Sequence, residues 1–166
     1  MPRRRKTPVR RPAAAPAAVT ADSPCPCGLD DRRYGDCCGV FHAAAKASAA
    51  SATGPAGGPP APAPATAELL MRSRYSAFAV GDTGYLLRSW HSRSRPERLE
   101  LDPAQRWVRL EVLDATDGGP FHVGGTVAFR AHWTERGEPG VLAETSRFVR
   151  EGGAWVYLDG VLEPAP

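Results

Sequence analysis

Residues 126–159, TVAFRAHWTERGEPGVLAETSRFVREGGAWVYLD, are the most regular part of the sequence. Apolar and polar residues alternate along three runs, as they do in strands with one buried face: Thr126–Glu135, Val141–Glu151 and Trp155–Asp159. Short glycine-containing segments separate these runs at residues 136–140 and 152–153. Because strands joined by such short turns pair antiparallel, this stretch predicts an antiparallel meander.

An earlier run, residues 107–113, alternates in the same way and predicts one more strand. Its alternation places Val108, Leu110 and Val112 on one face, with Trp107 on the other. The sheet is therefore expected to have four strands.

Two helices are predicted before this sheet. Apolar residues recur at helical spacing in the first of them: Leu70, Met71, Tyr75 and Phe78. Thr66 is a suitable N-cap for this helix, and Gly81-Asp82 ends it and caps a second, shorter helix that carries Tyr85, Leu86 and Trp90. Helices followed by a meander indicate an α+β domain, with N-terminal helices on one curved antiparallel sheet.

Composition divides the chain into four segments. Residues 1–24 are rich in Arg, Pro and Ala, residues 25–42 hold every cysteine, and residues 43–67 contain almost only Ala, Gly, Pro, Ser and Thr. The prolines of the third segment predict an extended, unpacked linker. Residues 68–166 carry all four tryptophans, so the hydrophobic core is expected there.

Charge is distributed unevenly along the chain. The formal net charge is +3, but the first 21 residues carry +6, which leaves −3 for the rest. Nucleic-acid contact is therefore expected only through the basic tail, which is otherwise a disordered solubilising segment. The sequence offers neither a run of about 18 apolar residues for a membrane span nor the apolar region of a signal peptide, so a cytoplasmic protein is expected.

Four cysteines lie within 14 residues: Cys25, Cys27, Cys37 and Cys38. This density in a cytosolic chain favours a zinc site, because Zn²⁺ takes four thiolates that converge from a short loop. Four protein ligands leave no open position, so a structural role is expected. Two alternatives stay open: His42, otherwise a surface residue, replaces one of the adjacent cysteines, or the thiols are redox-active or unpaired.

The cysteines belong to a longer resemblance. Cys25-Pro-Cys-Gly, Tyr34 and Cys37-Cys-Gly39 resemble the SEC-C motif, the zinc-binding tail of the SecA translocation ATPase. The order of motifs is similar to that of the YchJ-like uncharacterised protein family: the SEC-C motif is followed by Leu70-Met-Arg-Ser-Arg-Tyr75, Trp90-His91, Ser146-Arg-Phe148 and Trp155-Val-Tyr-Leu-Asp-Gly160.

The resemblance implies a SEC-C zinc motif joined to a conical domain like nuclear transport factor 2 (NTF2). The implied zinc ligands are Cys25, Cys27, Cys37 and Cys38, and no biochemical activity is implied. The loop between Cys27 and Cys37 is one residue longer than in the usual motif, and a bulge is expected to absorb the extra residue.

A conical sheet closed by helices leaves a pocket, and polar residues within apolar patterns are the candidates to serve it: Glu144, His91, Arg72, Arg74 and Arg147. In the functional interpretation, Glu144 is a general base or a ligand-orienting acid with His91 nearby. In the structural interpretation, which the lack of a legible catalytic constellation favours, Glu144 pairs with an arginine of the first helix. Catalytic residues and enzyme status stay unassigned.

Two functional expectations follow. In the first, residues 25–42 form a zinc knuckle that recruits a protein partner, and the linker tethers it to the cone. In the second, the protein is a small-molecule enzyme or binding protein that acts in the cone pocket. Contact with nucleic acid through the Arg-rich tail is a weaker third. The common nucleotide, hydrolase and metalloprotease motifs do not occur in the sequence.

Overall fold

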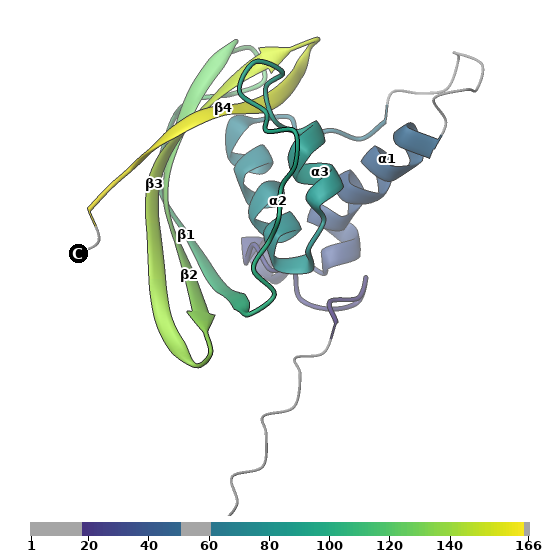
Figure 1. The fold of residues 1–166 in the computed structure, drawn as a ribbon. Coiled ribbons are helices and arrows are strands. Elements are labelled where there is room, and N and C mark those ends of the chain that lie inside the picture. Colours follow the sequence, from purple (N-terminus) through teal and green to yellow (C-terminus); the bar gives the residue numbers. More distant parts are fainter. Residues whose placement is uncertain (1–17, 51–60, 165–166) are drawn as a thin grey trace, which may run out of the picture.

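The computed structural model describes residues 18–50 and 61–164. These contain two short 3-10 turns, three α-helices and four strands: η1 (Leu29–Asp31), η2 (Tyr34–Asp36), α1 (Cys38–Ala50), α2 (Ala67–Val80), α3 (Thr83–Arg88), β1 (Gln105–Asp117), β2 (Gly124–Glu135), β3 (Glu138–Glu151) and β4 (Ala154–Leu162). The strands form one antiparallel sheet in the order β1-β2-β3-β4, and its concave side faces the helices (Figure 1). The predicted α+β architecture is confirmed. Among the described residues, no helix is long and apolar enough to cross a membrane.

The ends of α2 and α3 follow from the residues predicted to cap them. The side chain of Thr66 accepts a hydrogen bond from the backbone N–H of Leu69 at the start of α2. Gly81 ends the helix with φ 74°, in the left-handed region that glycine adopts without strain. Asp82 then accepts from the N–H of Tyr85 and begins α3. These caps fix where α2 begins and ends below the sheet.

The first strand departs from simple alternation. A register shift between Trp107 and Arg109 places Trp107 on the same face as Leu110 and leaves Val108 62% exposed. The expectation that Val108 shares a face with Leu110, opposite Trp107, is therefore wrong. A bulge inserts one residue and reverses the alternation, and nothing in the apolar pattern announces it. Its consequence is that the indole of Trp107 joins the concave face.

The chain that follows α3 is fixed to the free edge of the sheet. The backbone N–H of His91 donates to the carbonyl of Tyr157 at 2.7 Å, and the N–H of Tyr157 donates to the carbonyl of Ser89 at 2.9 Å. This short parallel bridge between Trp90 and Tyr157 covers part of β4 and holds the Trp90 ring against the helices.

The knuckle, residues 25–42, continues into structure on both sides. Helix α1 runs on from Cys38 to Ala50, so the prediction of an unpacked linker is wrong for residues 43–50. Alanine has the highest helix propensity, and Lys46 anchors the helix with its Nζ 3.0 Å from a carboxylate oxygen of Asp82. Residues 51–60 of the predicted linker lie outside the described residues.

The residues just before the knuckle are also ordered, contrary to the predicted end of the tail at residue 24. The N–H of Tyr34 donates to the carbonyl of Ser23, and the N–H of Gly35 donates to that of Ala21, both at 2.8 Å. Residues 1–17 of the basic tail lie outside the described residues.

Candidate metal centre and cone cavity

The four cysteines converge on one buried point. Their Sγ atoms all lie within 4.8 Å of one another, and the Sγ atoms of Cys27 and Cys37 are 3.7 Å apart. Tetrahedral Zn–S bonds of about 2.3 Å place the sulfurs about 3.8 Å apart, whereas a disulfide needs about 2.05 Å. All four cysteines are free thiols and none is more than 8% exposed. The cluster therefore has the size and the closed surroundings of a four-coordinate metal site.

Local backbone geometry aims these side chains. Cys25 and Cys27 lie on a turn in which the N–H of Gly28 donates to the carbonyl of Cys25 at 3.0 Å. Cys38 opens α1, directly after the turn that contains Tyr34. The long loop between them closes on itself, since the N–H of Cys25 donates to the carbonyl of Arg32 at 2.8 Å.

Two residues of that loop, Asp30 and Asp31, have φ of 51° and 50°. Left-handed backbone of this kind is uncommon outside glycine, and aspartate tolerates it better than most residues. The loop therefore accommodates its length in η1 without moving the cysteines apart.

The thiols influence one another's ionisation. Hydrogen bonds from neighbouring thiols, first that of Cys27, lower the pKa of Cys25. The hydrogen bond to Cys25 in turn raises the pKa of Cys27 to about 12 and raises that of Cys38. Cys25 therefore ionises readily, whereas Cys27 and Cys38 resist ionisation until a cation compensates their charge. A set of four sulfur donors fits a divalent ion with affinity for thiolate.

His42 does not belong to the cluster. It is 2% exposed, which contradicts the expected surface position. Its Nδ1 lies 2.6 Å from the hydroxyl of Tyr34, and its Nε2 lies 2.9 Å from the carbonyl of Ser73. A neutral ring that donates from Nε2 and accepts at Nδ1 satisfies both partners. Through these two contacts, His42 connects the turn that contains Tyr34 to helix α2.

The pH dependence of stability is expected to report His42. Burial lowers its pKa from the ordinary 6.5, so below that pH the unfolded chain takes up a proton that folded His42 resists. Stability should fall as the pH decreases below 6.5, with a contribution from this group of at most about 1.4 kcal/mol per pH unit. His42→Gln should show a shallower slope in urea unfolding measured from pH 7.5 to 5. Acid release of metal affects both proteins, so the difference between their slopes is the readout. Equal slopes would contradict the assignment.

Gly39 is required by the close approach of α1 to the preceding turn. A Cβ at this position would lie 2.6 Å from the carbonyl oxygen of Tyr34. Gly39→Ala is expected to weaken metal retention and to lower stability by about 1–3 kcal/mol, because backbone has to move next to Cys38. Chelator competition and thermal unfolding measure the two effects. Gly84→Ala in α3 is the matched control and should lose neither, because its Cβ would meet only side-chain atoms, the flexible end of Arg88 at 3.2 Å and the Asp82 carboxylate at 3.5 Å.

The knuckle packs directly on α2. The Sγ of Cys25 lies 3.6 Å from the hydroxyl of Ser76, and Arg72 donates from NH1 to the carbonyl of Cys27 at 3.2 Å. With the contact of His42 to Ser73, three separate bonds join knuckle and helix. The expectation of a knuckle that is merely tethered to the cone is therefore wrong.

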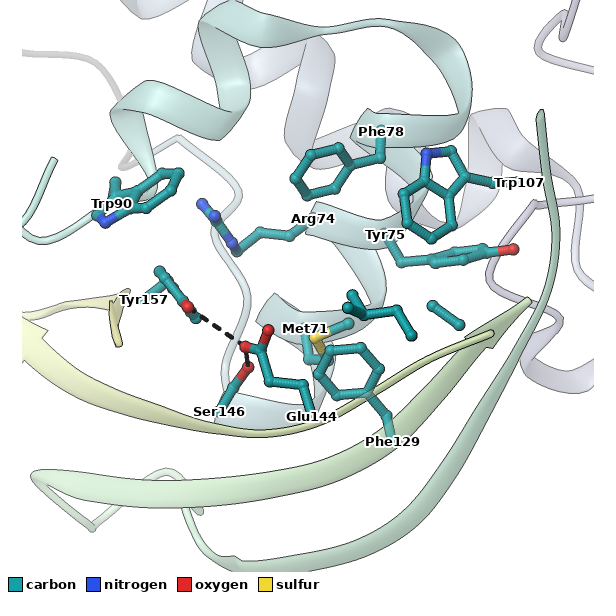
Figure 2. Close-up of a pocket in the computed structure, with 12 residues that line it drawn as sticks. Met71, Arg74, Tyr75, Phe78, Trp90, Trp107, Phe129, Glu144, Ser146 and Tyr157 are labelled. Atoms are coloured by element: carbon teal, nitrogen blue, oxygen red, sulfur yellow. Dashed lines mark hydrogen bonds between the residues drawn. The ribbon is translucent and has the colours of Figure 1, made fainter. Parts of the chain in front are cut away.

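The opposite side of α2 faces a cavity of about 240 Å³ between the helix and the concave sheet. This space is called the cone cavity below. Aromatic side chains form most of its wall: Tyr75, Phe78, Trp90, Trp107, Phe129 and Tyr157. Three polar residues, Arg74, Glu144 and Ser146, gather at one end of it (Figure 2). A mostly apolar cavity with a few converging polar groups is the usual form of a small-molecule site.

Arg74 enters this cavity from α2. It is 4% exposed, and its NH1 donates to the carbonyl of Leu86 at 2.8 Å and to the hydroxyl of Ser89 at 2.7 Å. Its guanidinium carbon lies 5.0 Å from the ring centroid of Trp90 and 4.7 Å from that of Tyr157 (Figure 2). Burial lowers the pKa of Arg74 to about 10, so the group remains charged at neutral pH.

Glu144 enters from β3, on the face predicted by the alternation. Its Oε1 accepts hydrogen bonds from the hydroxyls of Ser146 at 2.5 Å and Tyr157 at 3.2 Å. The expected pair with an arginine of the first helix is not formed, since no salt bridge of the described residues includes Glu144. The hydroxyls of Ser146 and Tyr157, and not an arginine as expected, are the hydrogen-bond partners of this carboxylate.

The other three cavity candidates lie elsewhere. The Nε2 of His91 lies 3.7 Å from a carboxylate oxygen of Glu151, the last residue of β3, and His91 does not line the cavity. Arg72 bonds Glu68 at 2.8 Å beside the knuckle. Arg147 pairs with Asp159 on the exposed side of the sheet. His91 therefore does not share the cavity with Glu144, as the functional interpretation required.

Sequence reasoning missed most of the cavity wall. Its aromatic residues, such as Tyr75, Phe78 and Phe129, have the same apolar pattern in the sequence as any core residue. A cavity forms where side chains leave space between a helix and a sheet, and the residue types in the sequence do not show where that space lies. The positions of the aromatic residues require the register of all four strands.

A cone of this kind, closed by helices and carrying a four-cysteine cluster beneath its central helix, defines a SEC-C protein with an NTF2-like domain. Residues 66–160 match the family described as YchJ, middle NTF2-like domain. The chain is 54% identical over 137 residues to a UPF0225 protein of Streptomyces coelicolor, covering 82% of this chain and 94% of that protein. It is 45% identical over 163 residues to a UPF0225 protein of Ralstonia nicotianae, covering 91% and 96%. The chain therefore belongs to the YchJ-like UPF0225 family, as its motifs indicated.

Solved structures show the same architecture. The solution structure of a SEC-C motif containing protein from Rhodopseudomonas palustris has a TM-score of 0.62 and 26% identity, and covers 84% of this chain and 98% of that chain. The crystal structure of a SEC-C motif containing protein from Psychrobacter arcticus shares the fold with a TM-score of 0.62, at 22% identity and with coverage of 89% and 86%.

Proposed function

We propose that this protein binds a small molecule in the cone cavity and that a structural zinc ion in the knuckle holds the helix that forms the cavity floor. The observation that carries the proposal is a buried guanidinium and a carboxylate that face the same cavity without pairing. Leaving two charged groups unpaired below a sheet is unfavourable for stability, and such arrangements concentrate at binding sites.

Zinc is the metal that the donor set supports best. Four thiolates in a closed, tetrahedral arrangement suit Zn²⁺, and a closed site supplies stability without chemistry. Cys25, Cys27, Cys37 and Cys38 are the proposed ligands. The bonds from this cluster to Ser76 and Arg72 carry the stabilisation into α2.

The binding function is tested by filling the cavity. Ala131 is 2% exposed and lines the cavity, whereas Ala128 lies on the outer face of the same strand. Ala131→Leu should abolish binding of ring-sized probes such as toluene, and Ala128→Leu should leave it unchanged. The indole N–H resonances of Trp90 and Trp107 are expected to shift on binding, while that of Trp155, away from the cavity, stays in place. Equal responses of both variants would exclude the cone cavity as the site.

A second function, recruitment of a protein partner by the knuckle, is favoured by one observation. A hollow of about 180 Å³ borders the cluster, and its lining combines apolar side chains with three cysteines and three charged residues: Leu29, Val40, Phe41, Leu69, Cys27, Cys37, Cys38, Arg32, Asp36 and Arg72. Val40, which is 36% exposed, is accessible to a partner's apolar side chain. Val40→Asp should weaken the binding of any protein partner that the full chain captures, and it should not release the metal. Capture that is unaffected by Val40→Asp and by chelation would exclude the knuckle as a recruitment surface.

A further inference from the structure

We infer that the cone cavity selects an uncharged ligand whose polar group carries a hydrogen-bond donor and an acceptor side by side, as a primary carboxamide does, on a compact ring. This inference deepens the proposed small-molecule function and rests on it.

Arg74 is the residue that calls for a hydrogen-bond acceptor on the ligand. Its NH1 is used by Leu86 and Ser89. Its Nε and NH2 have no hydrogen-bond partner among residues 18–50 and 61–164, although the residue is 4% exposed. Figure 2 shows the guanidinium at the wall of the cavity. A buried cationic donor gains most from a ligand oxygen, because charge-assisted hydrogen bonds are about twice as strong as neutral ones.

The donor is required by Glu144. Both hydroxyls that bond this carboxylate reach the same atom, Oε1. Within the described part of the chain, Oε2 has no hydrogen-bond partner. Gly160 behind it allows the carboxylate its position, since a Cβ there would lie 2.1 Å from Oε1. A ligand N–H would supply the bond that Oε2 lacks.

Charge balance excludes ionic ligands as the preferred class. The cavity contains one cation, Arg74, and one carboxylate, Glu144. A ligand carboxylate would compensate Arg74 but face Glu144, and a ligand ammonium or amidinium would do the reverse. Either adds an unbalanced charge to a mostly apolar cavity, which is costly. An amide satisfies the two groups and leaves the net charge unchanged.

The rest of the cavity sets the shape of the ligand. Phe78 and Trp107, with ring centroids 5.7 Å apart, form the apolar end together with Phe129. Space of about 240 Å³ accommodates one six-membered ring and its substituent. Flat ring faces suit such walls, because aromatic groups pack edge to face at these distances.

Four probes of one shape test the inference: benzamide, benzoate, benzamidine and toluene. They are titrated into the full, metal-loaded chain at pH 7, with the indole resonances of Trp90 and Trp107 as the readout. Benzamide is expected to bind at least about ten-fold more tightly than the other three, since each of them leaves Arg74 or Glu144 unsatisfied.

Glu144→Gln provides the decisive variant. Its amide can donate where the carboxylate cannot, and it leaves Arg74 as the one charged group of the cavity. The preference should shift towards benzoate, by about ten-fold relative to benzamide. Glu138→Gln, the same change at an exposed position of β3, should leave the preference as it is.

The outcomes separate the inference from the function on which it rests. Toluene binding as tightly as benzamide, or benzoate or benzamidine binding more tightly, overturns the carboxamide inference and keeps the cavity as a binding site. Failure of all four probes to shift Trp90 and Trp107 overturns the proposed function itself. A preference for benzamide that persists in Glu144→Gln also overturns the inference, because it removes Glu144 from the recognition.

Discussion

Chelation of the proposed zinc is expected to destabilise the cone, although none of the zinc ligands belongs to it. Every tryptophan lies in residues 68–166, so urea unfolding followed by tryptophan fluorescence reports the cone alone. The free energy of unfolding should fall by about 4 kcal/mol or more when metal is removed, because structural zinc binding is coupled to folding. The route is physical contact, through Cys25 to Ser76 and through Arg72 to Cys27.

Cys38→Ser serves as the matched variant for this experiment. It should have the lowered stability before any chelator is added, and chelator should then have no further effect. A tryptophan transition that is the same with and without metal would show that the knuckle and the cone unfold independently. The contacts to α2 would then have no energetic weight.

Two replacements of Arg74 are expected to separate the contribution of its side-chain volume to stability from the contribution of its charge. Arg74→Ala should lower stability by about 3 kcal/mol, because it leaves a void between Trp90 and Tyr157. Arg74→Met, which keeps most of the volume, should remain within about 1 kcal/mol of the natural protein. Burial that lowers the pKa of this arginine to about 10 corresponds to a cost of about 3 kcal/mol at neutral pH. Loss of that cost offsets the two lost hydrogen bonds to Leu86 and Ser89.

Urea unfolding of the two variants in parallel gives the comparison. If Arg74→Met is as unstable as Arg74→Ala, the charge holds the fold together and the arginine is structural. If Arg74→Met is stable, the fold does not need the positive charge of Arg74. Ligand binding would then be the reason for a charged side chain in the cavity that Glu144 also lines.

The sequence predicted what depends on neighbours along the chain. The caps Thr66 and Asp82, the turn at Gly152-Gly153 and the order of helices before strands are local features, and they are confirmed. The turn expected at residues 136–140 is shorter, because β3 already begins at Glu138. The four cysteines could be found because they lie close together in sequence. The helix at residues 43–50 was missed because alanine next to proline-rich sequence is typical of a linker. The contact that anchors this helix, from Lys46 to Asp82, joins two distant segments and is not visible in the local sequence.

The cavity depends on features that no local pattern contains. The bulge after Trp107 moves an indole to the concave face, and hydroxyls from β3 and β4 meet Glu144 where an arginine was expected. The same limit applies to His42, whose partners Tyr34 and Ser73 come from two different elements. A pairing between distant segments requires the register of the sheet and the packing of α2, both of which are global.

Helix α2 has no exposed residue, because the knuckle covers one of its sides and the cavity and sheet cover the other. The family match begins at residue 66, directly before the first residue of this helix. A chain cut there would present Ser73 and Ser76, which are fully buried in the intact protein, to water on the side of α2 that the knuckle covers. We therefore expect the NTF2-like part and the cysteine motif to unfold as one cooperative unit, and the part beginning at residue 66 to be less stable alone than in the full chain.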